Sequence, residues 1–154
     1  MIMSAARGFF RRAQRNLALG LSSLLLVGLS GCGLTPKVNL VLDKADDEAA
    51  KLCACNWQFL NYDSEADCVA DEATTPSERD CVQRVVAESE DKELNERVLD
   101  CYNRAYDDLA ACNSSLGCTD NLAWAGCYID WGIDIGQCPD TNTQVAVDIA
   151  DCLN

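Results

Sequence analysis

The chain contains no histidine, and none of its 11 cysteines forms a Cys-x-x-Cys pair. Zinc fingers, zinc ribbons and the Cys-x-x-Cys-His attachment site of c-type haem each need at least one of these features. The lack of histidine also removes the side chain that most often transfers protons at neutral pH. We therefore expect no metal and no cofactor, and an enzyme built on this chain would have to use carboxylates.

The sequence also lacks an apolar run long enough to span a bilayer. The longest such run, Leu17–Leu29, has thirteen residues, whereas a transmembrane helix needs about twenty. Four arginines precede this run, and the first acidic residue of the chain is Asp43. A basic segment followed by a short apolar segment is typical of an N-terminal targeting signal.

The apolar run ends in Leu29-Ser30-Gly31-Cys32, which resembles the lipobox of bacterial lipoproteins. The resemblance implies that residues 1–31 are a signal peptide and that Cys32 carries a diacylglyceryl group. Two or three acyl chains on one cysteine give lasting membrane attachment, which a single chain does not. Because glycine and not aspartate follows Cys32, the resemblance also implies sorting to the outer membrane. The protein would be lipid-anchored there, on the periplasmic or the cell-surface face.

Removal of residues 1–31 leaves 123 residues, enough for one domain. We expect residues 32–40 to be a short tether and residues 41–154 to be an acidic domain. The mature part contains eight basic and 25 acidic residues, a formal charge of −17. Such a charge repels nucleic acid and anionic lipid headgroups, so nucleic acid is not an expected partner.

Ten cysteines remain after Cys32, and an even number in an exported chain predicts disulfides, here five. Cys53 and Cys55 lie about 200° apart around a helix, so each must bond to a different neighbour. The ten cysteines are Cys53, Cys55, Cys68, Cys81, Cys101, Cys112, Cys118, Cys127, Cys138 and Cys152.

The spacing leaves the pairing of the other cysteines open. Cys101 and Cys112 share a helix face but lie about 16 Å apart along it, too far to bond. Cys112 and Cys118 flank a short helix break and could close it. Cys101 could pair with Cys81 across a helical hairpin or with Cys127 beyond that break, and we slightly favour Cys81.

Apolar residues recur at helical spacing along the mature chain, and alternating strand-like runs are scarce. The clearest start signal is Thr75, followed by Pro76 and by Glu78 in a capping-box position. The sequence therefore predicts an all-α fold, a small disulfide-stapled bundle of about five to six helices. We expect helices near 41–56, from Ser64 through Cys68, near 75–89, 92–113, 120–131 and 142–153.

The lipobox, the Cys-x-Cys at Cys53 and Cys55, and cysteines spread at helical intervals through an acidic chain resemble small cysteine-rich lipoproteins. Such lipoproteins are abundant in myxobacteria and related delta-proteobacterial lineages. The resemblance implies a disulfide-stapled helical domain, and it brings no established activity.

Trp124, Tyr128 and Trp131 lie at i, i+4 and i+7, so three aromatic side chains share one helix face. A stripe of this kind is usually part of the core, which is the interpretation we favour. The alternative is a surface that binds a protein or glycan partner by stacking.

Acidic residues offer little evidence of a metal or catalytic site. Asp63, Glu65 and Asp67 occupy the first ligand positions of a calcium loop, but Cys68 stands where glycine is needed and Thr74 where glutamate is needed. No spacing marks a catalytic pair among the 25 acids. We expect a non-catalytic binding or surface module, and the alternative is an envelope hydrolase that uses paired carboxylates.

The disulfide interpretation makes a direct prediction. If Cys53 through Cys152 form five bridges, mass spectrometry after alkylation of the unreduced, exported protein should find no free thiol among them. Chelator should not unfold the protein, whereas reduction should, because loss of even one native disulfide typically costs about 2–5 kcal/mol. Thiols released by chelation would instead indicate metal-bound thiolates.

Overall fold

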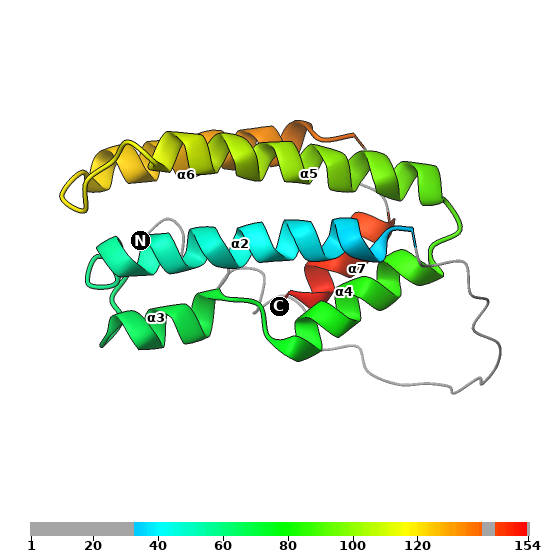
Figure 1. The fold of residues 1–154 in the computed structure, drawn as a ribbon, viewed down its shortest axis with the longest axis horizontal. Coiled ribbons are helices and arrows are strands. Elements are labelled where there is room, and N and C mark those ends of the chain that lie inside the picture. The colour runs from blue at the N-terminus through cyan, green and yellow to red at the C-terminus, as the bar shows by residue number, and fades with distance from the viewer. Residues whose placement is uncertain (1–32, 140–143, 154) are drawn as a thin grey trace.

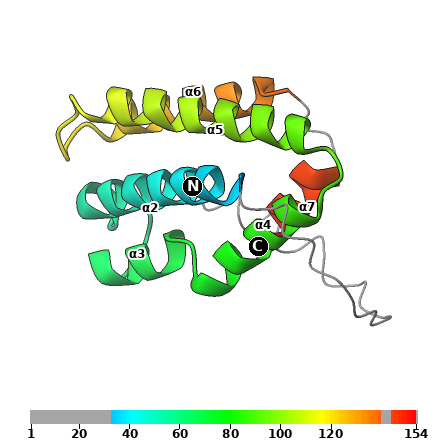
Figure 2. The same ribbon diagram turned by 45° about the vertical axis from the view of Figure 1, so that its right-hand side comes forward.

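The computed structural model describes residues 33–139 and 144–153, and within these ranges it contains helices and no strands. The all-α prediction is therefore confirmed. Figure 1 shows α5 and α6 on one side of α2, with α3 and α4 on the other, and the turned view of Figure 2 agrees. The helices of the described residues are α2 (Thr35–Asn56), α3 (Glu65–Glu72), α4 (Pro76–Glu88), α5 (Lys92–Asn113), α6 (Asn121–Gln137) and α7 (Gln144–Cys152).

Helices α2 and α5 pack in parallel, in a register marked by ion pairs. Lys37 Nζ donates to Glu96 Oε1 at 2.7 Å and to Asp100 Oδ1 at 2.8 Å. Seven residues further along both helices, Lys44 Nζ donates to Asp107 Oδ1 at 2.5 Å. The hydrogen bond to Asp100 is the main reason that the pKa of Lys37 is raised. These pairs are partly exposed, so they specify the register more than they add stability.

Helices α3 and α4 follow one another back along the opposite side of α2, antiparallel to it. Near the α3–α4 junction, the Thr74 backbone N–H donates to Asp46 Oδ1 at 2.7 Å, and Arg79 forms an ion pair with Asp46. Further along α4, Gln83 Nε2 donates to Asn39 Oδ1 at 2.7 Å. Residues later in α4 therefore contact residues earlier in α2, so the two helices run antiparallel.

The main core cluster lies where α2, α4, α5 and α7 meet. Its side chains are mostly small aliphatic ones, and it contains no buried phenylalanine or methionine among the described residues. The buried members are Val38, Val41, Leu42, Val82, Val86, Leu99, Ile149 and Cys152.

All ten cysteines after Cys32 form disulfides, as the sequence predicts. Cys53 and Cys55 bond to different helices or turns, which confirms the argument from their positions around α2. The bridges are Cys53–Cys68, Cys55–Cys118, Cys81–Cys152, Cys101–Cys138 and Cys112–Cys127.

The expected pairing of Cys101 with Cys81 is wrong, and so is its rival, Cys101–Cys127. Cys81 bonds to Cys152 of α7 and Cys101 bonds to Cys138. The physical reason is that α4 and α5 are not a packed hairpin: they lie on opposite sides of α2 (Figure 1). A short turn connects these two helices without bringing their faces together.

The suggested Cys112–Cys118 bridge is also wrong. Cys112 bonds to Cys127 on α6, which runs antiparallel to α5, and Cys118 in the connecting turn bonds to Cys55 near the end of α2. The turn is thus attached to a third helix and is not closed on itself.

Two helices are longer than the sequence predicts. Helix α2 begins at Thr35, not near residue 41, so most of the expected tether at 32–40 is helical. Pro36 lies in the first turn of α2, where proline is well tolerated, and Val38 joins the core. Helix α6 continues through Gly132 to Gln137, and Cys138, just beyond its end, is bonded to α5.

The sequence signals for helix starts predict the structure better than the cysteine spacing predicts the disulfide pairing. The Thr75 hydroxyl accepts from the Glu78 N–H, and the Glu78 carboxylate accepts from the Thr75 N–H, so the capping box is complete. The predicted helix at 92–113 matches α5. Hydrogen bonds within one turn of chain fix these boundaries without tertiary help.

Two leucines on neighbouring helices differ in burial, and this difference predicts different effects on stability when each is replaced by alanine. Leu109 of α5 is 2% exposed, whereas Leu122 of α6 is 90% exposed. Leu109→Ala should lower the free energy of unfolding by about 2–5 kcal/mol, through lost burial and a cavity. The matched control Leu122→Ala should change it by less than about 0.5 kcal/mol. Chemical denaturation with the disulfides intact measures both, and equal effects would contradict this packing.

Candidate functional site

The aromatic stripe of α6 points into the bundle. Trp124 is 4% exposed, and its indole Nε1–H donates to the Gly117 carbonyl at 3.1 Å. Trp131 packs against Tyr106 of α5 with ring centroids 5.3 Å apart, and against Tyr128 at 6.3 Å. The stripe thus lies at the α5–α6 contact, with Trp124 buried and with Tyr128 and Trp131 half-buried.

A buried carboxylate lies beside this stripe. Glu48 of α2 is 3% exposed; its Oε2 accepts from Asn113 Nδ2 at 2.8 Å, and its Oε1 accepts from Lys51 Nζ at 2.5 Å. The Tyr128 hydroxyl donates to the Glu48 backbone carbonyl at 3.2 Å. Burial raises the pKa of Tyr128, and the nearby Glu48 charge raises it further. This cluster joins α2, α5 and α6, and its partners compensate the buried charge.

The opposite face of α6 is apolar and open. Leu122 is 90% exposed, Ile129 54% and Ile133 51%. At 3.6 residues per turn, these three side chains fall within about 40° of one another around the helix. They lie about 180° from the tryptophans. A helix that is apolar on all sides is normally buried. In α6, one apolar face is packed against the bundle and the other is in solvent. We call the exposed face, formed by Leu122, Ile129 and Ile133, the outer face of α6.

The surroundings of the outer face are acidic and uncrowded. Asp130, which is exposed, borders it at about 80° around the helix from its middle, and Asp134, also exposed, lies further round at about 120°. Helix α6 contains no lysine or arginine. A Cβ atom added at Gly126, Gly132 or Gly136 would have no atom within 4 Å. No neighbouring element of the described chain therefore covers these positions.

The outer face was not predicted from the sequence, because the aromatic residues of the same helix are the more prominent signal. The signal was present: Leu122, Ile129 and Ile133 are spaced by seven and four residues, the pattern of a helix face. With apolar residues on both sides of α6, however, the sequence alone does not tell which side packs against the bundle.

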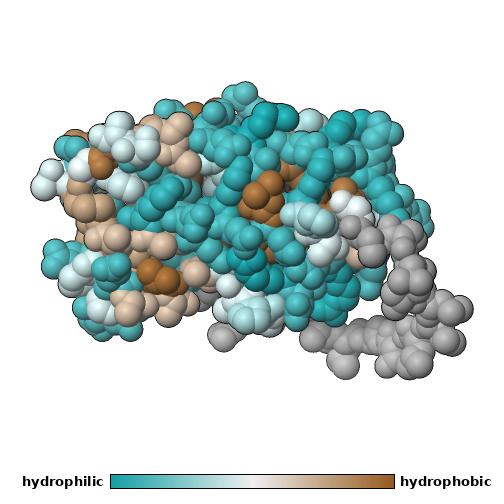
Figure 3. Space-filling model, viewed as in Figure 1, coloured by the Kyte–Doolittle hydropathy of each residue, from teal (hydrophilic) through white to brown (hydrophobic). Residues whose placement is uncertain are grey.

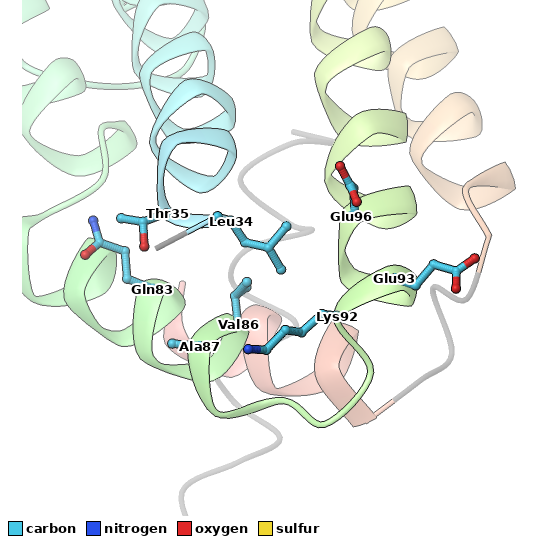
Figure 4. Close-up of a pocket in the computed structure, with 9 residues that line it drawn as sticks. Leu34, Thr35, Gln83, Val86, Ala87, Lys92, Glu93 and Glu96 are labelled. Carbon is cyan, nitrogen blue, oxygen red and sulfur yellow. The ribbon is translucent and has the colours of Figure 1, made fainter. Parts of the chain in front are cut away.

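A pocket of about 340 Å³ lies between the start of α2, α4 and the start of α5. Figure 4 shows Leu34 and Val86 pointing into this space, with Lys92 at its edge. Its walls are partly apolar, and it lies next to Gly33, the first described residue.

The acidic residues of this pocket are already paired. Glu96 accepts from Lys37 at 2.7 Å, and Glu93 lies 3.7 Å from Arg97.

The acidic segment at 63–67 serves as a helix start. The Ser64 hydroxyl accepts from the Asp67 N–H at 3.1 Å, which caps α3. Within residues 33–139 and 144–153, no three Asp, Glu or Cys side chains are grouped so that they could hold a metal ion. None of the helices described there combines the length and apolar character needed to cross a bilayer.

Comparison of the chain with protein-family models, curated proteins and solved structures finds no match. The residues of the chain itself are therefore the basis on which its function is inferred.

The open surroundings of α6 predict a gain in stability. Glycine inside a helix is less favourable than alanine by about 0.5–1 kcal/mol, and a methyl group at Gly132 meets no atom within 4 Å. Gly132→Ala should therefore raise the free energy of unfolding by about that amount. Gly117→Ala, in the turn before α6, is the control and should show no such gain. A loss of stability in Gly132→Ala would mean that another part of the protein covers this side of α6.

Proposed function

We propose that this protein is an outer-membrane lipoprotein, anchored through Cys32, whose disulfide-stapled helical domain is a non-catalytic module that binds another protein. The observation that carries the proposal is the position of α2. Only Gly33 and Leu34 separate Cys32 from the first residue of this helix, and two residues span at most about 7 Å.

This short connection would hold the domain directly at the bilayer surface. Leu34 itself packs against the core cluster, so little chain is left to act as a flexible linker. A module placed in this way binds partners that reach the membrane surface, and it does not sample a wide volume on a long tether. The five disulfides support an extracytoplasmic site, because disulfides persist in oxidising compartments.

The side chains of the domain support binding over catalysis. The carboxylates of the pocket are ion-paired, the buried Glu48 is hydrogen-bonded, and the aromatic stripe is packed inside. The outer face of α6, in contrast, leaves large aliphatic side chains in solvent, which is typical of protein interaction surfaces. Aliphatic side chains do not supply the flat rings or polar groups that hold a sugar, so a protein partner is favoured over a glycan.

Lipid attachment is tested by labelling. Cells that express the chain and are fed labelled palmitate should incorporate the label into the wild-type protein, and Cys32→Ser should lose both the label and membrane association. Ser30→Ala is the matched control: it keeps a small residue in the lipobox and should be labelled like the wild type. Continued labelling of Cys32→Ser would contradict anchoring at this residue.

A further inference from the structure

We propose that the outer face of α6 docks an amphipathic helix of a protein partner, one that carries lysine or arginine beside its apolar residues. This inference rests on the proposed function, because it names the surface and the partner chemistry of the binding module.

The first argument is that the apolar side chains of α6 are gathered and not scattered. Leu40, Phe59 and Val147 are also exposed, but they lie singly on α2, in the turn after α2 and on α7. Single exposed apolar residues are common on soluble proteins and need no explanation. Figure 3 shows a mainly hydrophilic face, on which apolar residues form only small groups. On α6, by contrast, three large side chains share one face.

The second argument is the shape of the outer face, which fits a helix. Leu122 and Ile133 are eleven residues apart, so the stripe runs about 16 Å along the axis of α6. Steps of seven and four residues are those of a coiled-coil seam, in which apolar side chains of one helix fit between those of another. Gly126 lies between Leu122 and Ile129 on the same side and leaves space for a partner side chain.

The third argument is charge, which selects among possible occupants. Asp130 borders the outer face, Asp134 lies one turn further along α6 and further round the helix, and no base on α6 offsets them. Lysine or arginine beside the apolar seam of a partner would pair with the Asp130 carboxylate, as charged flanking positions do in coiled coils. Several bases of the mature chain already form ion pairs within the domain, among them Lys37, Lys44, Lys51, Arg79 and Arg97.

The same charge disfavours two other occupants. A second copy would bring together two domains that each carry a formal charge of −17, which opposes close association. Helices that lie in a membrane surface usually carry lysine and arginine on their polar face, whereas the flank here is acidic. A basic helix of another protein remains the occupant that both the apolar stripe and its flank favour.

The test uses the full chain, exported with its own signal and placed in phosphatidylcholine nanodiscs, or in solution if no lipid is attached. Three designed helical peptides are the probes. One has a leucine seam flanked by lysine, one has the same seam flanked by glutamate, and one has the lysines but serine in the seam. Fluorescence anisotropy measures each affinity at several salt concentrations. We expect the lysine-flanked leucine peptide to bind best, and more weakly as salt rises.

Two pairs of variants locate the binding. Ile129→Asn with Ile133→Asn should weaken binding of the lysine-flanked leucine peptide about tenfold or more, because two buried side chains are lost. Asp130→Asn with Asp134→Asn should weaken it about threefold and reduce its salt dependence.

The matched controls are Leu40→Asn with Val147→Asn, and Asp80→Asn with Glu88→Gln, at exposed sites on other helices. Both control pairs should bind like the wild type. Circular dichroism and thiol counting verify folding, and the aspartate pair keeps the test valid if the isoleucine pair does not fold.

Several results would overturn the proposal. These are equal binding of the glutamate-flanked or serine-seam peptide, no binding of any peptide, or equal loss in the control variants. A dimer of the wild type that Ile129→Asn with Ile133→Asn abolishes would assign the face to a second copy. Attachment to phosphatidylglycerol vesicles, lost in the same variant, would assign it to the bilayer. Failure of palmitate labelling would leave these measurements unaffected, so the anchor and the docking surface are tested separately.

Discussion

The packing of three helices around α2 is the constraint on which the rest of the structure depends. Helix α5 lies along one side in parallel, in the register set by Lys37 and Lys44. Helices α3 and α4 return along the other side. Helices α6 and α7 then pack mainly on α5 and α4, the helices that α2 has positioned. Because α2 begins at Thr35, the segment that organises the bundle would also be the one next to the proposed lipid anchor.

The disulfides compensate for a core of small side chains. Valine dominates the main cluster, and small side chains bury little apolar area. Each bridge joins two segments that pack together, and Cys81–Cys152 fastens α7, the last helix, to α4. Because disulfides restrict the unfolded chain, such bridges typically stabilise a small domain by a few kcal/mol each. The bundle can therefore remain folded without a large hydrophobic core.

The disulfides hold α6 in place while its aliphatic face stays exposed. Cys112–Cys127 attaches it to α5 near its middle, and Cys101–Cys138 attaches it just beyond its C-terminal end. A helix with three interior glycines and an exposed aliphatic face would gain little stability from its own propensity. Held by two bridges and by the inward packing of Trp124, it can keep Leu122, Ile129 and Ile133 in solvent. The packed surface that stabilises the domain and the proposed docking surface thus lie on opposite faces of one helix.

The sequence by itself determined what local chemistry decides: an all-α fold, the capping box at Thr75, the bounds of α5, and the fact that Cys53 and Cys55 need separate partners. These features follow from hydrogen bonds within one turn and from helical periodicity. Only the tertiary structure decided that Cys101 bonds to Cys138, that α6 runs past Gly132, and which apolar face of α6 packs inward. Each of these depends on which helices become neighbours, and that is set by contacts between residues far apart in the chain, which no local pattern encodes.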